Sequence, residues 1–142
     1  MSLRKLLFAT ALALGVSAVA TAEPVSFTLE GVEDRGGTLY ISVQTEEQYQ
    51  QQAGVAGDII RGPTAGTMEF DFDLPLGDYA VSVWHDHNGN DEFDFDENGM
   101  PADGWTASNA ANLRGAPTFQ DVKFTVGTGG VELKERMIYP TS

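Results

Sequence analysis

Short stretches in which apolar and polar residues alternate constrain the fold more than any other feature of this sequence. An apolar side chain at every second position is the period of a β-strand with one buried face. This pattern occurs at residues 25–29, 39–43, 68–74 and 79–83, and residues 119–126 and 131–139 are also expected to form strands. Frequent turn residues separate them, and no long run follows helical spacing. We therefore predict an all-β fold, an antiparallel Greek-key sandwich with about seven strands.

The residues between these stretches predict how the strands connect. Asp, Arg and two glycines at 34–37 favour a turn, so the strands on either side of it are expected to form a hairpin. The glycine-rich residues 127–130 predict a turn between the last two strands. Residues 46–53 are polar and rich in Gln, which is typical of a short helix or an exposed loop.

One short motif predicts a specific turn into a strand. Pro75, Gly77 and Tyr79 precede the alternating residues 79–83. This arrangement is similar to a tyrosine corner, in which the phenol hydroxyl binds nearby backbone in Greek-key sandwiches of the immunoglobulin-like or prealbumin-like type. We expect Tyr79 to be structural and not catalytic.

The N-terminus has the pattern of a secretory signal peptide. Arg4 and Lys5 precede the apolar residues 6–19, and the small residues 20–22 fit a cleavage site. The alternative is a retained transmembrane anchor, but the apolar run is short for a span of about 20 residues. We therefore predict a signal peptide at 1–22 and one sandwich domain at 23–142. The mature protein is expected in the periplasm or outside the cell, not anchored to the membrane.

Charge and cysteine content exclude several function classes. Eight Lys and Arg against 21 Asp and Glu give a net charge of −13. Binding to nucleic acid needs a basic face, so we expect no nucleic-acid partner. The absence of cysteine excludes disulfides, thiolate metal sites and cysteine nucleophiles. We expect a monomer that interacts with an unidentified small ligand or a partner in the cell envelope.

Acidic residues are crowded into one segment without basic residues to compensate them. No Lys or Arg lies between Arg61 and Arg114. Like charges at this density repel each other unless solvent, salt or a cation compensates them. The segment contains Asp86, Asp91, Glu92, Asp94, Asp96, Glu97 and Asp103.

The spacing within this segment predicts a calcium-binding loop at 86–97. Calcium loops of twelve residues place oxygen ligands at the first, third, fifth, seventh, ninth and twelfth positions, the seventh through its backbone carbonyl. The sixth position usually carries Gly, whereas this chain has Asp91, a residue that tolerates left-handed backbone. Asp96 is an alternative to Glu97 as the closing ligand, and a polar hairpin without an ion is the alternative to the whole site. The predicted ligands are Asp86, Asn88, Asn90, Glu92, Asp94 and Glu97.

Two histidines flank the first predicted calcium ligand. His85 and His87 share one face of a strand and could bind zinc or copper together. His85 also continues the core face of residues 79–83, so we favour a buried, hydrogen-bonded imidazole. Asp86, His85 and Ser108 could form a hydrolase site in principle. We predict no enzymatic activity, because those residue types often occur together by chance.

Residues 99–115 are rich in Ala, Asn and Gly and predict a long loop packed over the acidic loop. Trp105 lies within this segment, and we expect its ring to be buried as the anchor of the loop. The alternative is that Trp105 forms part of a groove for a ligand, such as a glycan. The protein would then be a binding module of the cell envelope.

At these residues the chain resembles the bacterial family called domain of unknown function 2141. The resemblance covers about residues 25–139, and the family usually has Gly in place of Asp91. It implies a small exported β-sandwich protein with no assigned activity, and it supplies no catalytic residues. The residues that carry it are Leu74, Pro75, Gly77, Tyr79, Ala80, His85, Asp86, Asn88, Gly89, Asn90 and Asp94, followed by Gly99, Pro101, Ser108, Asn109, Pro117, Phe119, Asp121 and Phe124.

The acidic loop is also similar to the loop of calcium-binding repeats on bacterial surface adhesins. In those repeats an aromatic residue precedes the loop, as Trp84 precedes Asp86 here. The similarity implies an ion that stiffens a prealbumin-like sandwich and has no catalytic role. Residues and resemblance together predict a non-enzymatic exported sandwich with a structural calcium ion.

Overall fold

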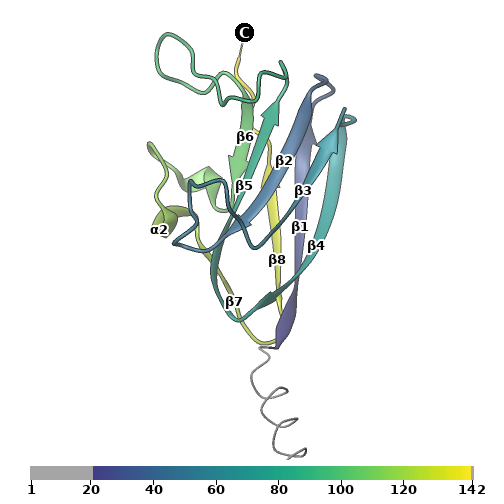
Figure 1. The fold of residues 1–142 in the computed structure, drawn as a ribbon, viewed down its shortest axis with the longest axis vertical. Coiled ribbons are helices and arrows are strands. Elements are labelled where there is room, and N and C mark those ends of the chain that lie inside the picture. The colour runs from purple at the N-terminus through teal and green to yellow at the C-terminus, as the bar shows by residue number, and fades with distance from the viewer. Residues whose placement is uncertain (1–20, 142) are drawn as a thin grey trace, which may run out of the picture.

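The computed structural model describes residues 21–141 and is built almost entirely from strands (Figure 1). Two short helices, η1 (Ala110–Asn112) and α2 (Phe119–Val122), lie beside the strands. The eight strands are β1 (Ala22–Val32), β2 (Thr38–Gln44), β3 (Ala56–Arg61), β4 (Gly66–Pro75), β5 (Gly77–Asp86), β6 (Gly104–Ala107), β7 (Phe124–Val126) and β8 (Val131–Arg136).

The strands form two sheets that pack as a sandwich. One sheet has the order β4-β1-β8, and the other has the order β3-β2-β5-β6, with β7 pairing with β5. β1 and β8 run parallel, whereas the other pairs between these named strands are antiparallel. The prediction of an all-β sandwich is confirmed, with eight strands and one parallel pair.

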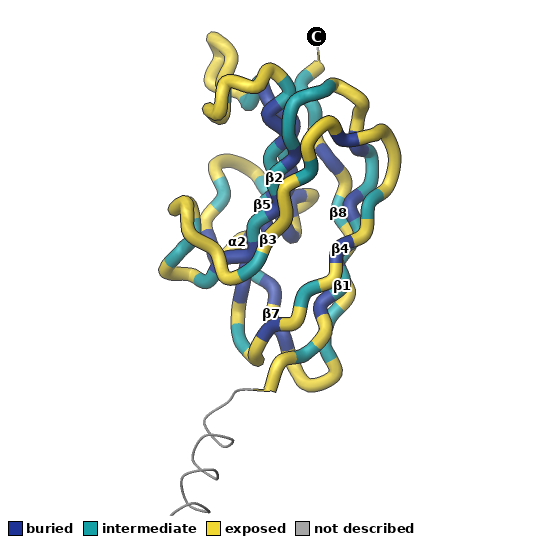
Figure 2. Tube along the Cα trace, turned by 45° about the vertical axis from the view of Figure 1, so that its right-hand side comes forward, coloured by how far each residue is buried: buried dark blue, intermediate teal, exposed yellow. Residues whose placement is uncertain are grey.

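The core lies between the inner faces of the two sheets. Val25, Phe27 and Leu29 alternate along β1 with partly exposed residues, and Leu39, Ile41 and Val43 do the same along β2. Figure 2 shows this alternation as buried segments along the strands and exposed loops at their ends. Full burial of each large apolar side chain contributes about 1.5–3 kcal/mol, which makes this interface the main source of stability.

The predicted tyrosine corner is confirmed and carries the chain from one sheet to the other. The Tyr79 hydroxyl donates a hydrogen bond to the Pro75 carbonyl oxygen at 2.8 Å. β4 lies in the three-stranded sheet and β5 in the other, so this hydrogen bond fixes the crossing.

The predicted hairpin across residues 34–37 is wrong, because this turn connects strands of different sheets. β1 pairs with β4 and β8, while β2 pairs with β3 and β5. The predicted turn at residues 127–130 is confirmed, since the Gly130 backbone N–H donates to the Gly127 carbonyl oxygen at 3.0 Å. This turn also connects different sheets, because β7 pairs with β5 and β8 pairs with β1. In a sandwich, each strand must bury one face against the opposite sheet, and crossing turns place consecutive strands on opposite sides of the core.

Three local predictions also need correction. Residues 119–126 are not one strand: the Thr118 hydroxyl and the Asp121 carboxylate cap each other's backbone and start helix α2. The segment 99–115 is not one long loop, because it contains β6 and η1. β3 was not predicted because its sequence lacks clear alternation, and it lies at the edge of its sheet.

Residues 46–53 form turns, in agreement with the exposed loop that was one of the two predictions. The buried Gln44 side-chain amide nitrogen lies 2.8–3.0 Å from the carbonyl oxygens of Gln48, Gln51 and Ala53. One side chain thus holds the loop against the end of β2.

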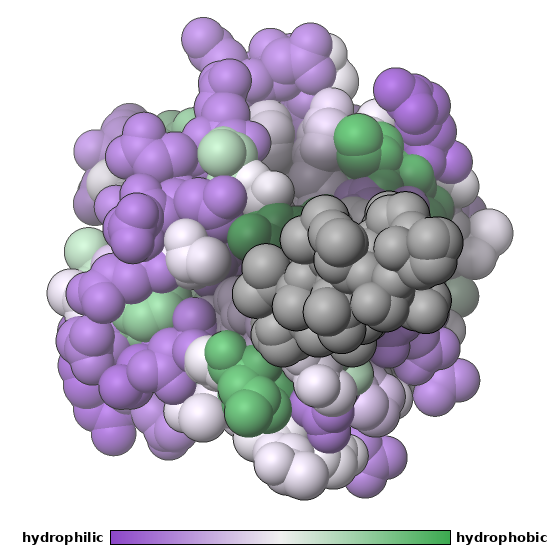
Figure 3. Space-filling view, turned by 60° about the horizontal axis from the view of Figure 1, so that its bottom comes forward, coloured by the Kyte–Doolittle hydropathy of each residue, from purple (hydrophilic) through white to green (hydrophobic). Residues whose placement is uncertain are grey.

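Residues 1–20, which make up most of the predicted signal peptide, lie outside the described residues. β1 begins at Ala22, where the predicted peptide ends. Within residues 21–141, no helix has the length and apolar character needed to cross a membrane. The end of the molecule where β1 begins has a mainly hydrophilic surface with a few separate apolar residues (Figure 3).

Candidate functional site

The acidic loop connects β5 to β6 and extends beyond the ends of both strands (Figure 1). His85 and Gly104 are paired across the two strands, so residues 87–102 form one hairpin loop. Asp86 ends β5 and Asp103 immediately precedes β6, and both side chains are buried, with 1% and 0% of their surface exposed. The base of the loop is therefore held between two buried carboxylates.

Asp94 lies at the centre of the polar contacts within the loop. The side-chain amide nitrogens of Asn88 and Asn90 donate hydrogen bonds of 2.8–2.9 Å to its carboxylate. These hydrogen bonds, that of Asn90 first, lower the pKa of Asp94 below its ordinary value. The structure thus brings together three of the six predicted ligands.

Asp86 has one satisfied oxygen and one unsatisfied oxygen. Its Oδ2 accepts a hydrogen bond from the Asp91 backbone N–H at 2.8 Å, whereas Oδ1 has no hydrogen-bond partner among residues 21–141. Asp91 adopts a left-handed backbone with φ of 61°, as the comparison with the sixth position of a calcium loop predicts. A buried polar atom without a partner costs about 1–3 kcal/mol, so Oδ1 of Asp86 is suited to a cation.

Glu92 and Glu97, the two remaining predicted ligands, have exposed side chains. The Glu92 backbone N–H donates to Oδ1 of Asn90 at 3.1 Å, which bends the chain at the seventh position of the loop. Glu97 lies in the next turn, where Oδ1 of Asp96 accepts from the backbone of Asn98 and Met100. That turn lies beyond the polar contacts around Asp94.

Asp103 is the residue that sequence reasoning did not select as a ligand. Its Oδ2 accepts hydrogen bonds from the Trp84 indole nitrogen at 2.8 Å and from the Asp94 backbone N–H at 3.1 Å. Its Oδ1 has no hydrogen-bond partner within the described part of the chain, and His87 Nδ1 lies 3.6 Å away. The sequence shows Asp103 in the acidic segment, but only the β5–β6 pairing brings it to the loop.

Carboxylates and imidazoles do not form a complete metal site by themselves. Among the residues that the structure describes, no group of three or more His, Cys, Asp or Glu is placed to hold a metal ion. Calcium also accepts amide and backbone carbonyl oxygens, so a calcium site here would depend on Asn88, Asn90 and the Glu92 carbonyl as well.

His85 is a buried structural residue, as its position in the strand predicts. Its Nε2 lies 2.7 Å from the Gly36 carbonyl oxygen, and its Nδ1 lies 2.7 Å from the Tyr139 hydroxyl. A carbonyl only accepts, so Nε2 carries the proton, and Nδ1 of the neutral ring accepts from Tyr139. Both ring nitrogens are thus engaged, which leaves neither free to bind zinc or copper together with His87.

Ser108 is likewise engaged in backbone contacts. It is buried, its hydroxyl donates to the Val122 carbonyl oxygen, and its oxygen accepts from the Val81 backbone N–H at 3.1 Å. These contacts tie β6 and α2 to β5. They leave no free hydroxyl proton for a neighbouring base.

A groove crosses the outer face of the β3-β2-β5-β6 sheet. Strand register aligns Ile59, Tyr40, Trp84 and Trp105 in one row across the four strands, and Ile138 pairs with Trp105 at the end of the row. The neighbouring row on the same face contains Gly57, Ser42, Ser82 and Ala107. A row of small residues beside a row of large ones produces a hollow, and all nine residues line the groove.

The walls of this groove contain most of the large apolar side chains that are exposed in residues 21–141. The groove holds about 1850 Å³. Of the seven large apolar side chains exposed in residues 21–141, six line it and only Leu76 lies elsewhere. Phe93 and Phe95 of the acidic loop are among the six, so this loop forms one wall.

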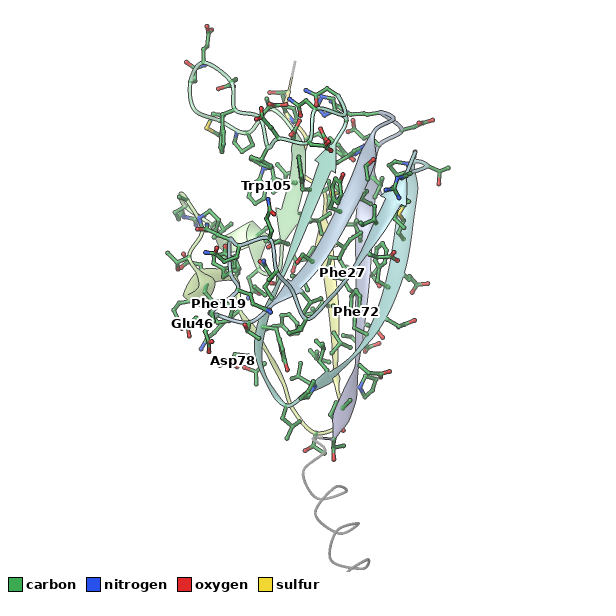
Figure 4. The ribbon with its side chains drawn as sticks, viewed as in Figure 1. Phe27, Glu46, Phe72, Asp78, Trp105 and Phe119 are labelled. Carbon is green, nitrogen blue, oxygen red and sulfur yellow. The ribbon has the colours of Figure 1, made fainter. Side chains whose placement is uncertain are left out.

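Trp105 is half-buried in the groove wall, so the prediction of a buried anchor is only partly right. Figure 4 places Trp105 apart from Phe27 and Phe72, which lie between the sheets. Trp105 packs against a second, smaller cluster of buried residues that includes Phe119 and Val122 of α2. The alternative prediction, that Trp105 forms part of a groove, agrees with this position.

The sequence model of a bacterial family, described as "Uncharacterized protein conserved in bacteria (DUF2141)", matches residues 27–134. The chain belongs to the DUF2141 family. The match begins within β1 and ends within β8, so it includes the acidic loop and the groove. Comparisons of this DUF2141 chain with curated proteins and with solved structures find no match.

Proposed function

We propose that this DUF2141 protein is an exported, non-enzymatic β-sandwich whose loop at 86–97 binds calcium as a structural ion. The observation that carries the proposal is Oδ1 of Asp86, a buried carboxylate oxygen that has no partner within residues 21–141. Asp86 begins a loop in which the predicted ligands Asn88 and Asn90 both contact Asp94. A cation at Asp86 would offset both the unsatisfied oxygen and the repulsion within the acidic segment.

Calcium fits this set of donors better than zinc or copper. It is a hard ion that takes six to eight oxygens, including amide and backbone carbonyl oxygens. The side-chain amide nitrogens of Asn88 and Asn90 donate to the Asp94 carboxylate. If both side chains rotate about the bond to the amide group, their oxygens can bind a cation that takes the place of the two N–H donors at Asp94. Glu92 would contribute its backbone carbonyl, and Glu97 would close the loop from the next turn.

Export rests on the predicted signal peptide at residues 1–22, and the low calcium affinity typical of extracellular sites suits that location. No catalytic role is proposed. Ser108 and His85, the residues that a hydrolase would use, hold backbone groups and Tyr139 instead.

The test is thermal unfolding of the mature protein in calcium and in excess chelator. A ligand that binds only the folded state stabilises it by about 2.7 kcal/mol at 100 times its dissociation constant. We expect calcium to raise the melting temperature by several degrees, and Asp86→Asn to remove that rise. Asp73→Asn, which removes the same charge from the exposed face of β4, should leave the rise unchanged. Superimposable curves for the unmodified protein in calcium and in chelator would contradict the proposal.

A second candidate function is the binding of an extended saccharide in the groove. The aromatic row of Tyr40, Trp84 and Trp105 offers flat rings, and Ser42 and Ser82 offer hydroxyls in the adjacent row. Ligand sites combine aromatic walls with a few placed polar groups in this way. The groove is also larger than the roughly 300–1,000 Å³ of a pocket for a small molecule, which favours an elongated ligand.

Tryptophan fluorescence during titration with neutral oligosaccharides of four to six units tests this function. Binding of the oligosaccharide should change the emission. Trp105→Ala should weaken the affinity for the oligosaccharide by at least tenfold (about 1.4 kcal/mol), because one aromatic face is lost. Leu76→Ala is the matched control, because Leu76 is exposed but lies outside the groove. Unchanged emission across the oligosaccharides, with the protein shown to be folded, would dismiss this candidate.

A further inference from the structure

Asp103 has two oxygens in two different environments. Oδ2 accepts from the Trp84 indole N–H and from the Asp94 backbone N–H. Oδ1 is buried and has no hydrogen-bond partner within residues 21–141, and the whole side chain has 0% of its surface exposed. The Asp103 carboxylate therefore binds one group of the sheet and one group of the loop through Oδ2, while Oδ1 remains a buried acceptor without a donor.

The carboxylates of Asp86 and Asp103 both bind the backbone of the same short segment of the loop. The second oxygen of Asp86 binds the backbone of Asp91, and the second oxygen of Asp103 binds the backbone of Asp94. Asp91 and Asp94 are three residues apart, so both carboxylates face one turn of the chain. Each carboxylate also has one buried oxygen without a hydrogen-bond donor in the described part of the chain.

His87 does not satisfy Oδ1 of Asp103. His87 Nδ1 lies 3.6 Å from Oδ1, beyond hydrogen-bond distance, and is itself a buried nitrogen without a partner in the described part of the chain. An ion pair with a protonated His87 would serve only this one oxygen. A cation between the loop and Asp103 would serve Oδ1 of both Asp86 and Asp103.

The other oxygen of Asp103, Oδ2, accepts from a side chain that lines the groove. Trp84, which donates to Oδ2, stacks on Tyr40 with ring centroids 5.0 Å apart and lies 6.3 Å from Phe93. All three rings line the groove. A change in the orientation of the Asp103 carboxylate would therefore move the Trp84 ring, and with it the aromatic row of the groove.

We propose that Asp103 supplies a calcium-binding oxygen through Oδ1 while Oδ2 holds the Trp84 indole, so that calcium in the loop fixes the aromatic wall of the groove. The inference rests on the proposed calcium loop and extends it, because it adds a ligand outside residues 86–97. Under this proposal, calcium binding determines how rigidly the aromatic side chains of the groove wall are held.

The experiment compares four proteins by calorimetric calcium titration and by NMR of the indole N–H groups. The proteins are the unmodified chain, Asp86→Asn, Asp103→Asn and His87→Gln. Asn at 103 keeps one oxygen for Trp84 and for the Asp94 backbone, and its amide can donate to His87, so the variant is expected to fold. Far-ultraviolet circular dichroism in the absence of calcium checks this for each protein.

We expect Asp103→Asn to weaken calcium binding by at least roughly tenfold and His87→Gln to change it less than about twofold. Calcium should shift the Trp84 indole resonance of the unmodified protein, and Asp103→Asn should abolish that shift. The Trp105 resonance, assigned with Trp105→Phe, should move less.

The outcomes separate this inference from the calcium proposal. No calcium binding by the unmodified protein would overturn both. Loss of binding in Asp86→Asn with unchanged binding in Asp103→Asn would overturn the role of Asp103 alone. Equal weakening in His87→Gln and Asp103→Asn would assign Asp103 to an ion pair with His87, and this would also overturn the inference.

Discussion

The buried imidazole of His85 depends on the hydroxyl of Tyr139 near the end of the chain. This hydroxyl accepts from the Glu33 backbone N–H at 3.0 Å and donates to Nδ1 of His85. The Arg35 guanidinium lies over the Tyr139 ring at 4.6 Å, and burial raises the pKa of the phenol. One side chain thus connects the turn after β1 with the core face of β5.

Replacing this tyrosine should destabilise the protein. Tyr139→Phe removes the hydroxyl and leaves Nδ1 of His85 buried without a partner, so we expect a loss of about 1–3 kcal/mol in the free energy of unfolding. Tyr40→Phe is the control, because the Tyr40 hydroxyl lies at 3.5 Å from Asp91 at an exposed site. Urea denaturation measures both. A loss no greater for Tyr139→Phe than for Tyr40→Phe would contradict the role of the hydroxyl.

The sequence predicts the conformation or contacts of some residues but not of others. The left-handed backbone of Asp91 and the hydrogen bond of Tyr79 followed from local patterns, since each depends on neighbours within a few positions. Asp103 lies seventeen positions after Asp86, and its two environments depend on the pairing of β5 with β6. No local spacing contains that information.

Helix α2 owes its start to a capping box. The Asp121 carboxylate accepts from the Thr118 backbone N–H at 3.0 Å and from its hydroxyl at 2.8 Å. These hydrogen bonds lower the pKa of Asp121 below its ordinary value of 3.8. The ionised carboxylate is therefore favoured in the folded state.

This shift gives a pH dependence of definite sign. Because the pKa is lowered on folding, the stabilisation is fully present above the ordinary value and is lost as the pH falls through the lowered pKa. We expect Asp121→Asn to be less stable than the unmodified protein at pH 7, with a smaller difference at pH 3, below the ordinary pKa of 3.8. Urea denaturation at both pH values measures it. A difference of the same size at both would show that the charge does not matter.

The elements that the sequence predicted best are those with a long alternating pattern. β1, β2, β4 and β5 agree with it because each buries one face against the core. α2 was missed because Phe119 and Val122, three positions apart, fit a short apolar strand as well as one helical turn. The hairpin prediction at 34–37 failed because a turn motif shows that the chain reverses but does not show which sheet receives the next strand.

The groove is a property of the whole molecule. Its aromatic row contains Tyr40, Trp84 and Trp105, which come from three strands and align only through strand register. The family match assigns these residues no activity, so their function rests on the chemistry of the wall and of the acidic loop beside it. A loop that is stiffened by an ion and also forms a wall gives the sandwich a way to make binding depend on calcium.

A crystal structure of the mature protein grown in calcium is the most direct test of the calcium loop. We predict an ion with oxygens of Asp86, Asn88, Asn90, Asp94, Glu97 and the Glu92 carbonyl at about 2.3–2.6 Å. The amide nitrogens of Asn88 and Asn90 should then no longer contact Asp94. A loop without an ion, in which both amides still donate to Asp94 and Oδ1 of Asp86 still lacks a partner, would contradict the account.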